Sequence, residues 1–214
     1  MKLMVLTISL FSIWLLFIQN TFAQKIIEQT NQVWFENNLE FRLTDYLDAE
    51  MSNSVRMDMT NSILDNSFVQ FGLSYNFLEY FKITGVYRVK TNEPEFLSEY
   101  FTNFNIKIPV NDFKIKLRSR YQNKDNIYRL KTLLRQRVML DYEIIKKWTL
   151  SGSAEIFYEI DRDFIDRSRY KFDITHKIAK RNDLTIGYLF ETQHNRKTPE
   201  NRDVLYIELS VRVL

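Results

Sequence analysis

The sequence predicts an all-β protein, an antiparallel up-and-down transmembrane β-barrel of about 12 strands, with about 10 strands as the alternative. Three observations support this prediction. Polar and apolar residues alternate with a period of two through most of the chain after residue 31. Aromatic residues make up 15% of the chain, although its mean hydropathy is only −0.32. An apolar segment of the kind that directs export precedes the alternating region.

The N-terminal segment has the three parts of a secretory signal peptide. Lys2 supplies the positive start, residues 3–18 form an apolar run, and Ala23 ends a small-residue cleavage site. The alternative is an N-terminal membrane anchor, but the apolar run is shorter than the roughly 20 residues that a spanning helix needs. We therefore expect a signal peptide at 1–23, an N-terminal tail or short strand at 24–31, and the barrel domain at 32–214.

Eleven segments of about ten residues carry the alternation, which is the length that a tilted membrane-crossing strand requires. Helical alternatives remain only for residues 61–65 and 128–134. In chain order the predicted strands are 33–43, 47–57, 69–77, 81–90, 99–108, 113–122, 129–142, 148–159, 167–178, 184–193 and 205–213.

Each predicted strand has one polar and one apolar face, as the period of two requires. In order along the chain, the polar faces include Glu36, Asp48, Gln70, Lys82, Glu99, Lys114, Arg129, Thr149, Arg167, Thr185 and Glu208. The opposite faces include Phe35, Leu47, Phe71, Phe81, Tyr100, Phe113, Leu130, Leu150, Tyr170, Leu184 and Leu205.

The connections alternate between short and long. Pro94, Pro109 and Pro199 fall between the segments, where a missing N–H removes no ladder bond. Outer-membrane barrels have short periplasmic turns and longer outer loops, so this alternation favours a membrane barrel. The tight connections are 44–46, 78–80, 109–112, 143–147 and 179–183, and the longer ones are 57–66, 91–95, 123–127, 160–165 and 194–202.

The strand number is the difficult part of this prediction. Eleven up-and-down segments would make the first and the last run in the same direction, whereas single-chain bacterial barrels have even strand numbers. An extra strand at 25–31 would give 12 strands. Alternatively, that tail passes through the lumen, or one segment is wrongly divided, which would give 10.

A soluble β-sandwich or barrel with an apolar core would alternate in the same way. Two features favour a lipid-facing apolar surface instead. Aromatic residues gather at the strand ends beside the tight turns, as in the girdles of membrane barrels. The polar face carries dense charge of both signs, which a hydrated or ion-paired lumen can accommodate. We expect the protein in the outer membrane of a Gram-negative bacterium. The girdle residues are Phe41, Tyr46, Phe77, Tyr80, Phe81, Phe113, Tyr142 and Trp148.

Four short patterns resemble one family. They are W-x-E-x-x-L-E-x-R at 34–42, the pair Tyr87-Arg88, R-x-R-Y-Q at 118–122, and L-R-x-R at 134–137. Over residues 30–214 the chain resembles a family of Bacteroidetes-type outer-membrane β-barrels, a domain of unknown function. The resemblance implies a location and a fold, and it brings no activity, ligand or catalytic residue.

The most prominent charged feature is a predicted basic wall on two adjacent strands. It could order ions or bind an anionic solute, or it could form a salt-bridge plug with acidic residues across a narrow lumen. The basic wall comprises Lys114, Lys116, Arg118, Arg120, Arg129, Lys131, Arg135 and Arg137. The predicted acidic partners are Glu36, Glu40, Asp48, Glu50, Glu155, Glu159, Asp173 and Glu191.

Catalytic and cofactor sites receive little support. The chain has no cysteine and two histidines, His176 and His194; the first is predicted at the lipid-facing rim and the second in a loop without a serine. We expect no enzyme, no metal and no cofactor. A net charge of +3 argues against nucleic-acid binding.

We therefore predict a small pore or solute-binding channel. A closed structural barrel and a lipid-modifying enzyme are the alternatives. The expected partners are outer-membrane lipid, the barrel-assembly machinery and small anionic solutes or ions, and the expected state is a monomer.

Overall fold

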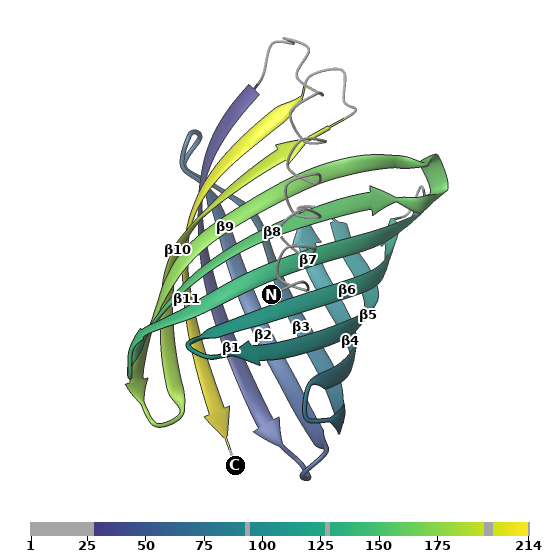
Figure 1. The fold of residues 1–214 in the computed structure, drawn as a ribbon. Helices are drawn as coiled ribbons and strands as arrows, with labels where there is room; N and C mark the ends of the chain where they lie inside the picture. The colour runs from purple at the N-terminus through teal and green to yellow at the C-terminus, as the bar shows by residue number, and fades with distance from the viewer. Residues whose placement is uncertain (1–27, 93–94, 127–128, 195–198, 214) are drawn as a thin grey trace, which may run out of the picture.

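The computed structural model describes residues 28–92, 95–126, 129–194 and 199–213, and these form one closed β-barrel (Figure 1). The predicted signal peptide at 1–23 lies outside the described residues. No helix among the described residues is long and apolar enough to cross a membrane. The strands are β1 (Glu28–Arg42), β2 (Leu47–Asp58), β3 (Ile63–Leu78), β4 (Phe81–Asn92), β5 (Glu95–Val110), β6 (Phe113–Asn126), β7 (Arg129–Ile145), β8 (Trp148–Glu159), β9 (Phe164–Ala179), β10 (Asn182–Gln193) and β11 (Glu200–Val213).

The all-β barrel prediction is confirmed, but the described residues form eleven strands rather than twelve or ten. Consecutive strands pair in antiparallel fashion, and β1 and β11 close the barrel as a parallel pair that runs from Glu28↔Glu200 to Phe41↔Val213. An odd up-and-down barrel must close in this way because its first and last strands point in the same direction. Residues 28–31, expected in an extra strand or tail, instead extend β1. We refer to the β1–β11 pair as the parallel seam.

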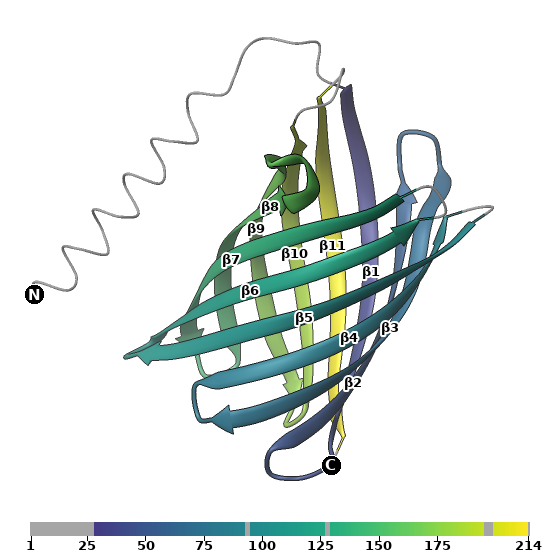
Figure 2. The same ribbon diagram turned by 90° about the vertical axis from the view of Figure 1, so that its right-hand side faces the viewer.

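The strands extend further toward one end of the barrel than the sequence predicts. The segment 61–65, a helical alternative, contains the turn before β3, and the described part of 128–134 lies in β7. The connections expected to be long are thereby shortened, except that a 3-10 turn, η2 (Ile160–Arg162), precedes β9. We call the end with residues 43–46, 79–80, 111–112, 146–147 and 180–181 the short-turn rim, and the opposite end the long-loop rim (Figure 2).

The outer face of the barrel is apolar and exposed, so the core does not lie there. Most of the predicted girdle is found at the short-turn rim, where the Phe113 and Tyr142 rings stack at 4.8 Å and Trp148 lies 4.2 Å from the ring of His176. Apolar area of this extent is costly to expose to water, and it resembles the lipid-facing surface of membrane barrels.

The inner face combines charged groups with buried apolar groups. Trp34, Leu189, Val204 and Tyr206 form a cluster on the inner wall beside the parallel seam, each no more than 4% exposed. Phe68, Phe101, Leu133 and Phe157 are also buried among polar neighbours that include Arg120, Arg135 and Glu155. The interior is therefore filled by its own side chains to a large extent, as small barrels are.

Candidate functional site: the lumen

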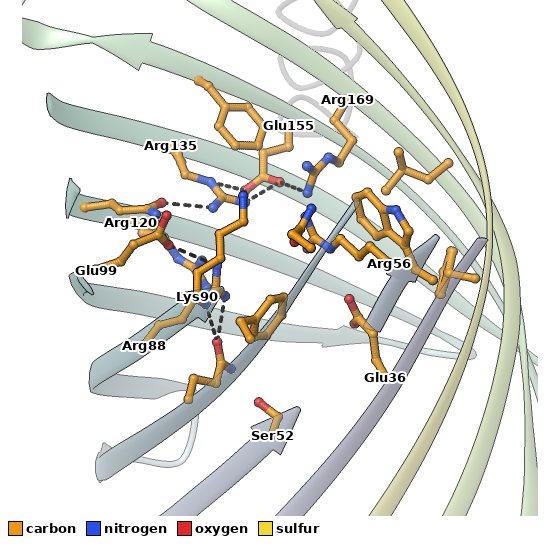
Figure 3. A pocket seen from close by; sticks show the side chains of 18 of the residues that line it. Glu36, Ser52, Arg56, Arg88, Lys90, Glu99, Arg120, Arg135, Glu155 and Arg169 are labelled. Carbon is orange, nitrogen blue, oxygen red and sulfur yellow. Dashed lines mark hydrogen bonds and ion pairs between the residues drawn. The ribbon is translucent and has the colours of Figure 1, made fainter. Parts of the chain in front are cut away.

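A cavity of about 430 Å³ occupies the half of the lumen nearer the long-loop rim; we call it the upper cavity (Figure 3). Its walls come from all eleven described strands, because alternate residues of each strand face the lumen. Four acidic residues line it, Glu36, Asp65, Glu99 and Glu155. Twelve basic residues line it: Arg56, Lys90, Arg88, Arg118, Arg120, Lys124, Arg135, Arg137, Arg167, Arg169, Lys171 and Arg202.

Arginine guanidinium groups lie over aromatic rings around this wall. The Cζ of Arg56 is 3.8 Å from the Trp34 ring centroid, and that of Arg120 is 4.0 Å from the Phe101 ring. Arg135 stacks in the same way on Phe157, at 4.1 Å. A guanidinium over an aromatic face is attracted by the ring quadrupole, by about 2 kcal/mol where both groups are removed from water. The rings therefore hold the arginines in place without neutralising their charge.

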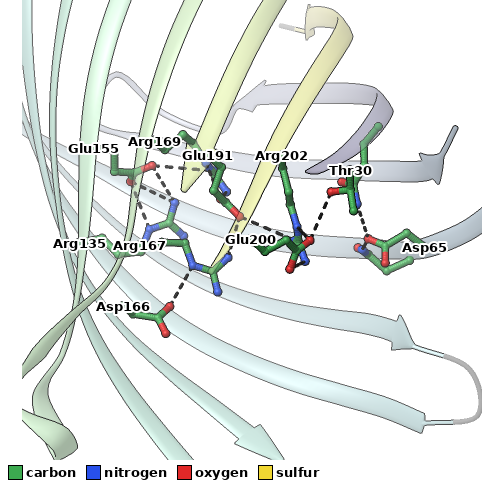
Figure 4. Close-up of polar contacts among 12 residues, drawn as sticks. Thr30, Asp65, Arg135, Glu155, Asp166, Arg167, Arg169, Glu191, Glu200 and Arg202 are labelled. Carbon is green, nitrogen blue, oxygen red and sulfur yellow. Dashed lines mark hydrogen bonds and ion pairs between the residues drawn. The ribbon is translucent and has the colours of Figure 1, made fainter. Parts of the chain in front are cut away.

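Two buried carboxylates anchor most of the paired arginines (Figure 4). Glu155 accepts hydrogen bonds from Arg118 at 2.6 Å and from Arg135 at 3.0 Å. Glu191 accepts from Arg169 at 2.5 Å and from Arg167 at 3.1 Å. Because each carboxylate serves more than one guanidinium, the network ties strands β6 to β10 together and still leaves positive charge in excess.

Five basic side chains of the upper cavity make no ion pair with any described residue. Arg56 has a buried Nε with no hydrogen-bond partner, and Arg120 donates its Nε to the neutral Asn103 side chain at 2.6 Å. The other three are Lys90, Arg137 and Lys171. Positive charge that the barrel does not neutralise itself is available to a solute.

A second space of about 590 Å³, the lower cavity, lies between the upper cavity and the short-turn rim. The two share Arg137, Lys171 and Tyr206 as lining residues, so Tyr206 lies where they meet. The Tyr206 hydroxyl donates to Asp173 at 2.5 Å, and Lys171 Nζ lies 4.0 Å from the Tyr206 ring. The lumen thus holds two chambers, the upper and the lower cavity, with an aromatic side chain at their boundary.

Gly187 makes room for this tyrosine. A Cβ atom at position 187 would lie 2.5 Å from Tyr206 Cζ and 2.6 Å from Asp173 Cβ, which is closer than real atoms approach. Gly187 of β10 lies directly opposite Tyr206 of β11 in the antiparallel register. Because Gly187 has no side chain, the Tyr206 ring can occupy this space.

The basic wall lies as adjacent residues on β6 and β7, with Arg118 opposite Arg137 and Arg120 opposite Arg135. The side chain of Arg129 lies outside the described part of the structure. The ion pairs of the other members are Lys114–Glu143, Lys116–Asp141, Arg118–Glu155, Arg135–Glu155, Lys131–Glu159 and Lys131–Asp166.

Only some of the predicted acidic partners form ion pairs with the basic wall. Glu155 and Glu159 do so, whereas Glu191 pairs with arginines of β9 and β11. Lys82 on β4 lies within 4 Å of Glu40, Asp48 and Glu50, Glu36 accepts from Ser54, and Asp173 accepts from Tyr206. The predicted pairing across the lumen is thus largely replaced by pairing between strands one to three places apart around the barrel, because nearby strands bring side chains closer than opposite walls do.

Sequence reasoning missed the aromatic half of the wall. Phe68, Phe101 and Phe157 occupy inward positions. They interrupt the run of polar residues on those faces, so the alternating pattern did not identify them as part of the lumen wall. Asp141 and Glu143, which pair with Lys116 and Lys114, were missed as partners too. The available signal was the recurrence of aromatic residues two positions from lumen-facing charges, as in Phe101 after Glu99.

The two histidines have partners on the outer face and at the rim. His194 Nε2 lies 3.1 Å from Ser168 Oγ of β9, so a serine outside its own loop reaches it. Burial lowers the pKa of His194 below its ordinary value. No carboxylate or amide oxygen is hydrogen-bonded to this ring among the described residues, so a catalytic triad is not assembled there.

Comparisons with known proteins agree with this architecture. A family model described as "Protein of unknown function (DUF2490)" matches residues 31–202. A solved structure of the NanC porin is similar with a TM-score of 0.51 and 9% identity over 74% of this chain and 85% of that one. A KdgM porin structure gives a TM-score of 0.46 and 13% identity over 74% of this chain and 89% of that one. These likenesses concern the fold alone. No curated protein matches the sequence.

Proposed function

Because this chain belongs to the DUF2490 family and folds as a porin-like β-barrel, we propose that it is a small passive pore in the outer membrane whose lumen favours anions. The observation that carries the proposal is the charge of the upper cavity, where twelve basic residues face four acidic ones. A lumen with uncompensated positive charge raises the local concentration of anions and excludes cations.

The lower cavity continues the basic lining to the short-turn rim. Lys107, Lys114 and Lys116 line it from β5 and β6, and Lys146 and Lys147 lie in the turn at its mouth. An anion that enters at either end therefore meets basic side chains in both chambers, which supports passage through the lumen rather than binding at one mouth.

The outer-membrane location and the partners belong to the same proposal. The exposed apolar outer face and its aromatic girdle fit a lipid bilayer, and export followed by insertion requires the barrel-assembly machinery. We propose a monomer with no nucleic-acid partner and no enzymatic activity of its own.

The first prediction tests the pore. Purified barrel in planar bilayers, under a KCl gradient, should conduct with a reversal potential displaced toward that of chloride. Replacing Arg118 and Arg120 by Glu should displace it toward potassium, because two inward charges change sign. Lys180→Glu, in a turn of the short-turn rim, is the control, and its reversal potential should remain displaced toward that of chloride.

A barrel that folds but carries no current above the bare bilayer would contradict the pore. The second candidate, a closed structural barrel, would then hold. It is favoured by the ion-pair network around Glu155 and Glu191, which occupies much of the upper lumen.

A further inference from the structure

We propose that the upper cavity is a binding site for a small organic solute with at least two carboxylate groups, held by Arg56 and Arg120. This deepens the proposed pore by naming the class of solute that its lumen recognises. The inference starts from the state of these two side chains rather than from the overall charge.

Arg56 is poised for a ligand. Its guanidinium lies 3.8 Å from the Trp34 ring and 5.1 Å from the Phe68 ring, and its buried Nε has no hydrogen-bond partner. No carboxylate lies within ion-pair distance of it among the described residues. A buried donor without an acceptor is costly. The guanidinium as a whole lines the cavity, where a solute carboxylate can pair with its charge. Figure 3 shows Arg56 and Glu36 on the same side of the cavity, without a bond between them.

Arg120 has the same design on another strand. Its Cζ lies 4.0 Å from the Phe101 ring, and Asn103 occupies its Nε. A guanidinium that stacks on a ring presents its N–H edge sideways, and that edge matches a carboxylate through two parallel hydrogen bonds. The terminal nitrogens of Arg120 have no acidic partner among the described residues, so they remain available for such a contact.

The number of unpaired cations indicates more than one carboxylate on the solute. Lys90, Arg137 and Lys171 line the same cavity and also make no ion pair with a described residue. Of the acidic groups that line the cavity, Glu99 is engaged by Arg88 and Lys124 and Glu155 by arginines, whereas Glu36 and Asp65 make no ion pair with a described residue and offset part of this charge. A single carboxylate would leave most of this charge unanswered. A volume of about 430 Å³ admits a solute the size of a small di- or tricarboxylic acid.

The second prediction uses Trp34 as the reporter, because it lies directly under Arg56. The chain has 3 tryptophans, so Trp14→Phe and Trp148→Phe leave Trp34 alone. Succinate, titrated into the detergent-solubilised barrel at constant ionic strength, should change Trp34 fluorescence saturably. Acetate should bind at least tenfold more weakly, and the neutral succinamide should have no effect.

Matched variants locate the site. Arg120→Gln should raise the dissociation constant for succinate at least tenfold, and it should leave the stacking of Arg56 on Trp34 unchanged. Arg212→Gln removes an equal charge near the short-turn rim, where Arg212 pairs with Asp183 and Glu40, and should change it less than twofold. Arg56→Gln should weaken succinate block of the chloride current, a readout independent of the fluorophore.

Three outcomes would overturn the inference: equal binding of acetate and succinate, no fluorescence change beyond that of sodium chloride, or equal weakening by Arg120→Gln and Arg212→Gln. These results are separable from failure of the pore. A barrel that binds succinate but carries no current contradicts only the pore, and one that conducts chloride but ignores succinate contradicts only this site.

Discussion

At the scale of single residues, the lumen is organised by small exceptions to the alternating pattern. An inward aromatic side chain gives each stacked arginine a fixed platform, and an inward glycine gives Tyr206 its place. Neither kind of residue carries charge, yet together they determine where the charged groups lie. The arrangement of charge in the lumen thus depends on residues that composition alone would assign to packing.

The third prediction concerns Gly187. Gly187→Ala places a methyl group 2.5 Å from Tyr206 Cζ, so Tyr206 must move and overpacking should cost about 1–3 kcal/mol. On gels, the folded barrel migrates faster than the unfolded chain. The Gly187→Ala barrel should convert from the fast to the slow form at a lower temperature than the unmodified barrel. Gly85→Ala is the matched control, because its methyl group would meet nothing within 4 Å. Equal conversion temperatures for Gly187→Ala and the unmodified barrel would show that Tyr206 is not confined there.

The identity of the lumen residues was predictable, but their partners were not. Alternation placed Lys116, Arg118 and Glu155 on inward faces, because side chains of a strand alternate whatever their neighbours are. Pairing also depends on the register between strands, which the sequence of either strand does not contain. Lys116 therefore meets Asp141 of the next strand, whereas the sequence pointed to carboxylates on the far wall.

At the scale of elements, the parallel seam is the feature that the sequence could not decide. The two-residue period predicted each strand and its faces, since that signal is local. Whether strands β1 and β11 close directly depends on barrel geometry as a whole. The expectation of an even strand number was reasonable for bacterial barrels, but barrels with odd numbers close through one parallel pair.

The fourth prediction tests the seam, and the absence of cysteine makes it simple. Asn37→Cys with Leu209→Cys joins two residues that face each other in the parallel register, so oxidation should cross-link them. Asn37→Cys with Val213→Cys is the control, because four residues of strand separate those positions by about 13 Å. Efficient cross-linking of the control pair, or none of the first, would contradict the register.

At the scale of the whole molecule, the barrel wall has two chemically different faces. Outward residues are apolar and exposed, inward residues carry the charge, and the mean hydropathy of −0.32 averages over both. The charge is also distributed unevenly inside, with lysines and arginines concentrated on β6 and β7 and carboxylates of β1 and β2 gathered around Lys82.

The fifth prediction follows from this distribution. If the preference for chloride arises from fixed charge in the lumen, it should be largest at low salt. The Debye length falls from about 10 Å at 0.1 M to about 3 Å at 1 M, so a mobile anion should sense the wall less strongly at high salt. Reversal potentials measured at constant concentration ratio should therefore shrink between these two conditions. A preference that does not change with salt would contradict its origin in the fixed charge of the lumen.

The parallel seam also determines the order in which the barrel can form. Synthesis delivers β1 first and β11 last, and no other described strand completes the pairing of β1. Until residues 200–213 arrive, one edge of β1 presents a row of unsatisfied backbone groups, which is a template for aggregation. Closure then joins segments about 170 residues apart, with the slow kinetics of contacts distant in sequence. A chain truncated before β11 would keep ten paired strands and yet remain an open sheet.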